Sequence, residues 1–258
     1  MANVPTRRRL TEAETSDRML GAAMSLLRRE GLTLDLRLRM EEVIEAAGVS
    51  RAAAYRKWPN RDVLVRDVLQ HVADSVEPPT VSAAEADRLV QRIARRHKQI
   101  PANRLQIAAD LLTEAALLEV AHLLDSGEWR DYLLLVAAVD TLPEGDVRDS
   151  IAKTLAVAEE RRSAGVVAAY DVVTETLGLR LRAGRTQVSL ARVATAMIRG
   201  SVTDAWRSAD RGARSRVTDD VKVAFPALLA AYLEPDPTAE VPADWPRRVR
   251  ESVREVLA

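Results

Sequence analysis

The sequence predicts an all-α protein with a small N-terminal helical domain and a larger helical domain behind it. Apolar residues recur at helical spacing along most of the chain, whereas the alternation typical of strands is rare. Glycine and proline residues interrupt these apolar stripes where helices are expected to end. Aromatic residues make up only 3% of the 258 residues, so the core must consist mainly of Leu, Val, Ile and Ala.

The first 76 residues contain signals for four helices. The first is expected to end at Gly31 and the second at Gly48, since glycine readily adopts the left-handed conformation that closes a helix. Ser50 is a good N-cap for a short third helix, which ends at Trp58 because a proline follows. Asn60 then caps a fourth helix.

The Pro-rich stretch EPPT predicts a domain boundary, which divides the chain into domains 1–76 and 80–258. Residues 234–246 are also Pro-rich and are expected to be extended, with a short amphipathic helix after them. The second domain is expected to contain six longer helices, over about 82–99, 102–125, 129–139, 146–178, 187–209 and 216–233.

Composition excludes several classes of protein. The chain has no cysteine, which excludes a disulfide framework, an iron–sulfur cluster and a cysteine-based zinc site. Arg7 to Arg9 are followed by LTEAETSDR, which is too polar for a signal peptide. The longest apolar runs, such as AGVVAAY, are too short to span a bilayer. We therefore expect a cytoplasmic protein that contacts no membrane and needs no cofactor.

The formal net charge of zero hides one basic segment. Between Ser50 and Arg66 there are five cations and one anion, so this segment carries a net charge of +4. A basic helical segment in a neutral chain indicates an anionic partner that is engaged at one place. The alternative interpretation is a solvated charged face. Arg7 to Arg9 have two interpretations as well, a disordered tail or an arm that lies on phosphates or in the minor groove.

Residues 40–58 follow the pattern of a helix-turn-helix motif, whose second helix enters the DNA major groove. Gly48 provides the turn, and Val49 can anchor that turn in the core. Ala54 and Trp58 are four residues apart and can face the core, which leaves the arginines of the helix exposed. The candidate DNA contacts are Ser50, Arg51, Ala52, Ala53, Tyr55, Arg56, Lys57 and Arg61.

Side-chain chemistry assigns different roles to these residues. Arg51 and Arg56 are candidates for reading base edges, since arginine bonds guanine in the major groove. Tyr55, Lys57 and Arg61 are candidates for phosphate contacts, and the end amides of the fourth helix would assist Arg61. Three consecutive alanines in the third helix leave few side chains for the bases, so DNA shape is expected to contribute to specificity.

The stretch AGVSRAAAYRKWPNRDVL (residues 47–64) resembles the signature of the TetR (tetracycline-repressor-like) family of bacterial transcriptional regulators. Trp58 stands where phenylalanine is commoner in that family, and Ala54 stands where a larger apolar residue is usual. Residues 32–39 form a loop about three residues longer than usual and lack the Thr or Ser that normally starts the second helix. The resemblance covers residues 12–70, and beyond them it is only architectural.

The resemblance implies a homodimeric regulator and not an enzyme. Such a protein binds double-stranded DNA at a palindromic operator, usually represses nearby genes, and is released by a small apolar or amphipathic ligand in its second domain. It dimerises through its last two long helices, which would be those at about 187–209 and 216–233. The fourth helix links the two domains and is the expected lever between them.

Several residues of the second domain are candidates for ligand binding. Asp171 could select a cationic ligand, but an exposed position on an amphipathic helix is the favoured interpretation. Glu119 and His122 form a Glu-x-x-His pair, but no second copy of that motif is present, so we expect no metal site. Two alternatives remain, a regulator controlled by a protein partner and a helical metal-binding bundle or enzyme. The candidate ligand contacts are His122, Trp129, Tyr132, Tyr170, Asp171 and Trp206.

Overall fold

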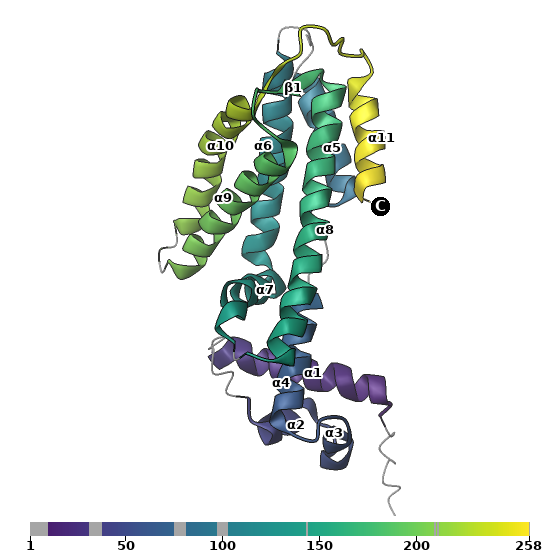
Figure 1. Cartoon of the computed structure of the whole chain (residues 1–258), viewed down its shortest axis with the longest axis vertical. Coiled ribbons are helices and arrows are strands. Elements are labelled where there is room, and N and C mark those ends of the chain that lie inside the picture. Colours follow the sequence, from purple (N-terminus) through teal and green to yellow (C-terminus); the bar gives the residue numbers. More distant parts are fainter. Residues whose placement is uncertain are drawn as a thin grey trace, which may run out of the picture. The chain divides into compact units, whose positions relative to one another are not determined.

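The computed structural model confirms the all-α prediction (Figure 1). It describes residues 10–30, 38–74, 81–96, 103–142, 144–208, 210 and 212–257. No helix in these ranges is both long enough and apolar enough to cross a membrane. The helices are α1 Glu12–Glu30, α2 Met40–Ala47, α3 Arg51–Lys57, α4 Arg61–Asp74, α5 Ala83–Arg96, α6 Arg104–Asp125, α7 Gly127–Ala138, the 3-10 helix η1 Val139–Thr141, α8 Asp146–Thr176, α9 Gln187–Arg207, α10 Ala213–Tyr232 and α11 Trp245–Leu257.

The chain divides by its internal contacts into two compact units. The first unit comprises residues 1–76 and 128–158, and the second comprises residues 77–127 and 159–258. The division after residue 76 lies at the boundary expected from the sequence. Residues 128–158 differ from that expectation, because they group with the N-terminal helices.

Polar contacts help to attach residues 128–158 to the first unit. Arg28 Nε on α1 donates a hydrogen bond to Asp131 Oδ2 on α7, at 2.7 Å. Gln70 Nε2 on α4 donates to Thr154 Oγ1 on α8, at 2.8 Å. Burial raises the pKa of Asp131, and the neighbouring Arg28 guanidinium partly opposes that rise. A sequence pattern cannot reveal such pairings, since the partners are 84 and 103 residues apart.

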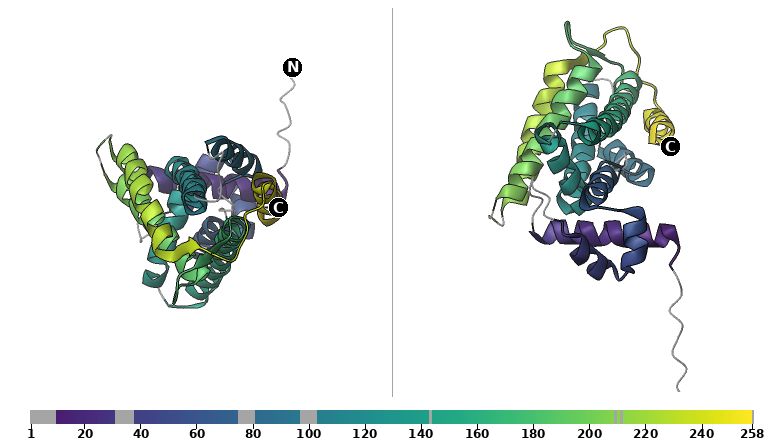
Figure 2. Two further views of the ribbon diagram at one scale, coloured as in Figure 1. Left: turned by 90° about the horizontal axis from the view of Figure 1, so that it is seen from above. Right: turned by 60° about the horizontal axis from the view of Figure 1, so that its bottom comes forward.

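The first unit is organised around α1, which packs against α2, α3 and α4. The right-hand view of Figure 2 shows these four helices, with α1 in purple and the others in blue. The apolar stripes expected from helical spacing supply the core of the unit. Its buried side chains include Met19, Ala23, Leu27, Val43, Ile44, Ala54, Trp58, Leu64, Val68, Leu69 and Val72.

The second unit is a bundle in which α10 packs against α6 and α9, and α5 packs against α6 and α11. Figure 1 shows α9 and α10 side by side, and α11 next to α5. The expected tail helix is therefore present as α11, and it packs on the bundle through buried Trp245 and Val249.

A short antiparallel pair of strands is the only sheet among the described residues. β1 (Leu179–Leu181) pairs with β2 (Leu233–Pro235), so that Arg180 lies opposite Glu234. Their side chains also form an ion pair, with 2.8 Å between Arg180 Nη2 and Glu234 Oε1. Strands of three residues are too short for an alternating pattern, and the sequence therefore predicted only extended chain at residues 234–246.

Some expected features lie outside the described residues. They are the N-terminal arginines Arg7 to Arg9, the helix stop at Gly31, most of the loop 32–39 and the boundary stretch 77–80. The end of that loop is described, and α2 begins at Met40 without a side-chain cap from the preceding Arg39.

Candidate DNA-binding surface and ligand pocket

The turn between α2 and α3 has the geometry that the sequence predicted. Gly48 adopts a left-handed conformation with φ of 63°, where a side chain would be strained. Ser50 is the N-cap of α3, and its Oγ accepts a hydrogen bond from the Ala53 amide at 3.2 Å. The turn and the cap together fix the direction in which α3 leaves α2.

Two core residues fix the rotation of α3. Ala54 and Trp58 are both 0% exposed, so the opposite face of the short helix is directed to solvent. Trp58 Nε1 donates a hydrogen bond to Asp67 Oδ2 on α4 at 2.9 Å, which satisfies the buried indole. Asn60 caps α4 as predicted, since its Oδ1 accepts from the Val63 amide at 3.0 Å.

The exposed face of α3 forms one wall of a concave surface in the first unit. Five of the predicted DNA contacts lie on that surface, and Arg56 among them is exposed without an ion-pair partner in the described parts of the chain. The surface also includes Arg18 of α1 and two glutamates of α2. The five predicted contacts are Ser50, Arg51, Ala52, Ala53 and Arg56.

Glu41 of α2 holds two of the candidate DNA contacts. Its Oε2 lies 2.8 Å from Arg51 Nη2, and its Oε1 accepts a hydrogen bond from the Tyr55 hydroxyl at 3.0 Å. The hydrogen bond to Glu41 also raises the pKa of Tyr55. Sequence reasoning missed Glu41, because its role depends on α2 and α3 facing each other across the turn.

Lys57 and Arg61 have partners within the first unit. The Lys57 ammonium donates to Ser16 Oγ on α1 and lies 5.2 Å from the centroid of the Trp58 ring. Arg61 Nε donates to the Leu38 carbonyl oxygen at 3.0 Å. Both cations therefore help to hold the four helices together, and both side chains remain largely exposed.

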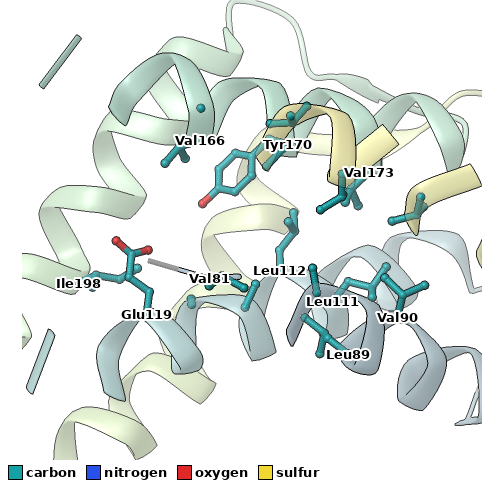
Figure 3. Close-up of a pocket in the computed structure, with 18 of the residues that line it drawn as sticks. Val81, Leu89, Val90, Leu111, Leu112, Glu119, Val166, Tyr170, Val173 and Ile198 are labelled. Atoms are coloured by element: carbon teal, nitrogen blue, oxygen red, sulfur yellow. The ribbon is translucent and has the colours of Figure 1, made fainter. Parts of the chain in front are cut away.

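A separate pocket lies within the second unit, with a volume of about 340 Å³. Ligand pockets of proteins typically range from about 300 to 1,000 Å³. Side chains of α5, α6, α8 and α11 supply most of its wall, and Figure 3 shows many of them. The aliphatic lining residues include Val81, Ala86, Leu89, Val90, Leu111, Leu112, Val166, Val173, Ile198, Val249, Val253 and Val256.

Polar groups are few in this pocket. Glu119 of α6 and Tyr170 of α8 line it, together with Arg161 and Arg162. Burial raises the pKa of Glu119. Burial also raises the pKa of Tyr170, and the charge of Glu119 adds to that rise. The Tyr170 hydroxyl therefore stays protonated at neutral pH.

The structure places only one of the six predicted ligand contacts in this pocket, which is Tyr170. Trp129 and Tyr132 stack edge to face in α7, which belongs to the first unit. His122 lies on the same helix as Glu119, but its Nε2 is 3.3 Å from Glu85 Oε1.

Asp171 and Trp206 are half-buried and do not line the pocket. Glu119 lines the pocket but is absent from the predicted ligand contacts. The sequence contains a signal for it, because an acidic residue in an apolar helix needs a polar or charged group to interact with. Among the described residues no group of three or more His, Cys, Asp or Glu side chains could hold a metal ion.

Comparison with known proteins agrees with this geometry. Residues 20–68 match the family "Bacterial regulatory proteins, tetR family". An uncharacterized HTH-type transcriptional regulator of Mycobacterium tuberculosis is 28% identical over 174 residues, which cover 57% of this chain and 90% of the relative. A regulator of Mycobacterium bovis has the same identity and coverage. A protein assigned to the TetR family from Mesorhizobium loti shares the fold, with a TM-score of 0.55 and 17% identity over 87% of this chain and 99% of that chain.

The fold and the exposed third helix define a helix-turn-helix DNA-binding protein. The family match covers α2 and α3 completely, together with most of α1 and α4. Residues 20–68 therefore carry a helix-turn-helix domain of the type found in the TetR family of bacterial regulatory proteins. Regulators of this family bind double-stranded DNA.

Proposed function

We propose that the protein is a homodimeric repressor, which binds a palindromic operator through α3 and leaves it when a small ligand occupies the pocket. One observation carries this proposal. The same chain combines an oriented, cation-bearing recognition helix in one unit with an apolar pocket in the other. The chain acts in this proposal as a regulator and not as an enzyme.

The DNA contacts in this proposal are the eight residues predicted from the sequence. Arg51 and Arg56 read base edges, while Tyr55, Lys57 and Arg61 contact phosphates. Arg51 and Tyr55 must break their contacts with Glu41 before they can contact DNA. Glu41 therefore restrains both side chains before binding and opposes the last step of binding.

Exposed apolar side chains on α9 and α10 support the proposed homodimer. Val188 and Val193 on α9 are 61% and 38% exposed, and Val223 on α10 is 76% exposed. A contact with a second copy through α9 and α10 would remove these apolar side chains from water. Phe225 and Leu229 of α10 face the other way and belong to the core of the single chain.

In this proposal α8 transmits the effect of the ligand, since its residues belong to both units. Residues 165–173 of α8 line the pocket, and Thr154 near its start accepts the hydrogen bond from Gln70 of α4. A ligand that shifts α8 therefore acts on α4. The ligand must also bind the DNA-incompetent state more tightly than the competent one, because equal affinity for both would shift no population.

The proposal is tested by recovering the genomic fragments that the purified protein binds. Labelled duplexes from these fragments are titrated by fluorescence anisotropy, first alone and then with compounds suggested by the neighbouring genes. We expect one dimer per duplex and release by a compound that occupies the pocket. Tight binding that no small molecule reverses would favour the alternative, a regulator controlled by a protein partner.

A further inference from the structure

The pocket of the second unit has one polar end and one apolar end. Figure 3 shows the Glu119 carboxylate and the Tyr170 hydroxyl toward the side of Val166 and Ile198, whereas leucine and valine side chains close the other side. The charge of Glu119 influences Tyr170, so the two polar groups share this end of the pocket. An occupant would therefore be amphipathic, with a single polar head.

The two arginines whose charges act on Glu119 already share another carboxylate as partner. Arg199 of α9 contacts both oxygens of Glu159, with 2.8 Å between Arg199 Nη1 and Glu159 Oε2. Arg162 also forms an ion pair with Glu159. Both arginines and His122 interact with Glu119 electrostatically, without a hydrogen bond to it. Within the described residues no side chain donates a hydrogen bond to Glu119, although burying a carboxylate without donors is unfavourable.

We propose that the ligand of this pocket is an apolar molecule that ends in a protonated amine, which binds Glu119 beside Tyr170. This inference rests on the proposed function, since it names the chemistry of the ligand that the pocket takes. A carboxylate accepts hydrogen bonds only, and a protonated amine offers three donors and the opposite charge. An alcohol offers one donor and no charge, and an anionic head would meet a like charge at Glu119.

The volume of the pocket sets the size of a suitable probe. A space of about 340 Å³ corresponds to about eleven water molecules at ~30 Å³ each. Decylamine has about this number of non-hydrogen atoms, and 1-decanol and decanoate present the same apolar chain with other heads. These three probes therefore separate the contribution of the head from that of the apolar body.

The test is isothermal titration of the full-length protein at neutral pH, without DNA, with each probe below its aggregation concentration. We expect the wild type to bind decylamine about 10- to 100-fold more tightly than 1-decanol, as expected for a hydrogen-bonded charge pair. Decanoate should bind most weakly. Glu119→Gln should lose the preference for the amine and keep its affinity for 1-decanol.

Two further variants make the test specific. Glu175→Gln removes an exposed glutamate of α8 that does not line the pocket, and it should retain the full preference for decylamine. Tyr170→Phe keeps the ring and removes the hydroxyl, and it should weaken decylamine binding by a few fold while the preference remains. Circular dichroism checks the fold of each variant, and the comparison of heads on the wild type stands even if Glu119→Gln fails to fold.

Equal affinity of the wild type for decylamine and 1-decanol would overturn the inference, as would a folded Glu119→Gln variant that still prefers the amine. If 1-decanol binds and releases operator DNA while the amine has no advantage, only this inference fails. If none of the three probes binds, both the inference about the amine head and the proposed role of the pocket in ligand binding are refuted.

Discussion

Replacement of Glu41 by glutamine is expected to strengthen operator binding. Glu41 holds both Arg51 and Tyr55 in the protein without DNA, at 2.8 and 3.0 Å. Glutamine keeps the shape of the side chain and removes its charge. Arg51 then turns to DNA without leaving an ion pair, and a carboxylate no longer lies beside the phosphates.

The expected magnitude follows from the exposure of the ion pair. The side chains of Arg51 and Glu41 are 76% and 50% exposed, so solvent screens most of their attraction. Exposed ion pairs contribute about 0.2–1 kcal/mol. Loss of this restraint should therefore tighten operator binding by about 1.5- to 5-fold.

Fluorescence anisotropy on the recovered operator, at one fixed salt concentration, measures this change. Glu45→Gln is the matched control, because Glu45 lies on the same helix and lines the same concave surface without a bond to Arg51 or Tyr55. The effects of Glu41→Gln and Tyr55→Phe on operator affinity should not be additive in the double variant, because both substitutions change the same contact. Weaker binding by Glu41→Gln, or an equal gain from Glu45→Gln, would refute the restraint by Glu41.

Three further predictions concern the second unit and its link to α4. Thr154→Val removes the acceptor for Gln70, and it should leave operator affinity nearly unchanged while the effect of ligand on that affinity falls about 2- to 10-fold, by anisotropy with and without ligand. Val253→Asp places a charge in the apolar wall formed by α11, and it should weaken binding of apolar probes by at least about tenfold in calorimetry. Glu119 should make the protein less stable as pH rises, because its raised pKa lets the folded state hold a proton that the unfolded chain releases near pH 4.5. The melting temperature of Glu119→Gln should therefore fall less than that of the wild type between about pH 4.5 and neutrality. Equal slopes would show that Glu119 does not titrate in this way.

Local sequence signals predicted the helices and the anchoring of α3 well. Ser50 caps the helix, Gly48 turns the chain, and Ala54 with Trp58 occupies the core, because each of these roles depends on near neighbours in sequence. Helical spacing likewise predicted α11, whose apolar side became part of the pocket wall.

Features that depend on distant parts of the chain could not be predicted in this way. The sequence indicates aromatic residues as candidates for the pocket, but Trp129 and Tyr132 belong to the first unit. Glu119 lines a pocket only because α6, α8 and α11, which are distant in sequence, pack together in the second unit. Spacing within one helix carries no information about such an assembly.

Replacement of Arg56 tests whether the exposed face of α3 reads operator DNA. Anisotropy titrations compare the wild type with Arg56→Ala on the operator and on duplexes with single base changes. Arg88→Ala, which removes an exposed arginine of α5 in the second unit, is the control. Arg56→Ala should lose about 1–3 kcal/mol of binding free energy on the operator and should no longer discriminate one base pair, while the control binds as the wild type. Unchanged affinity and discrimination in Arg56→Ala would contradict a role of α3 in reading operator DNA.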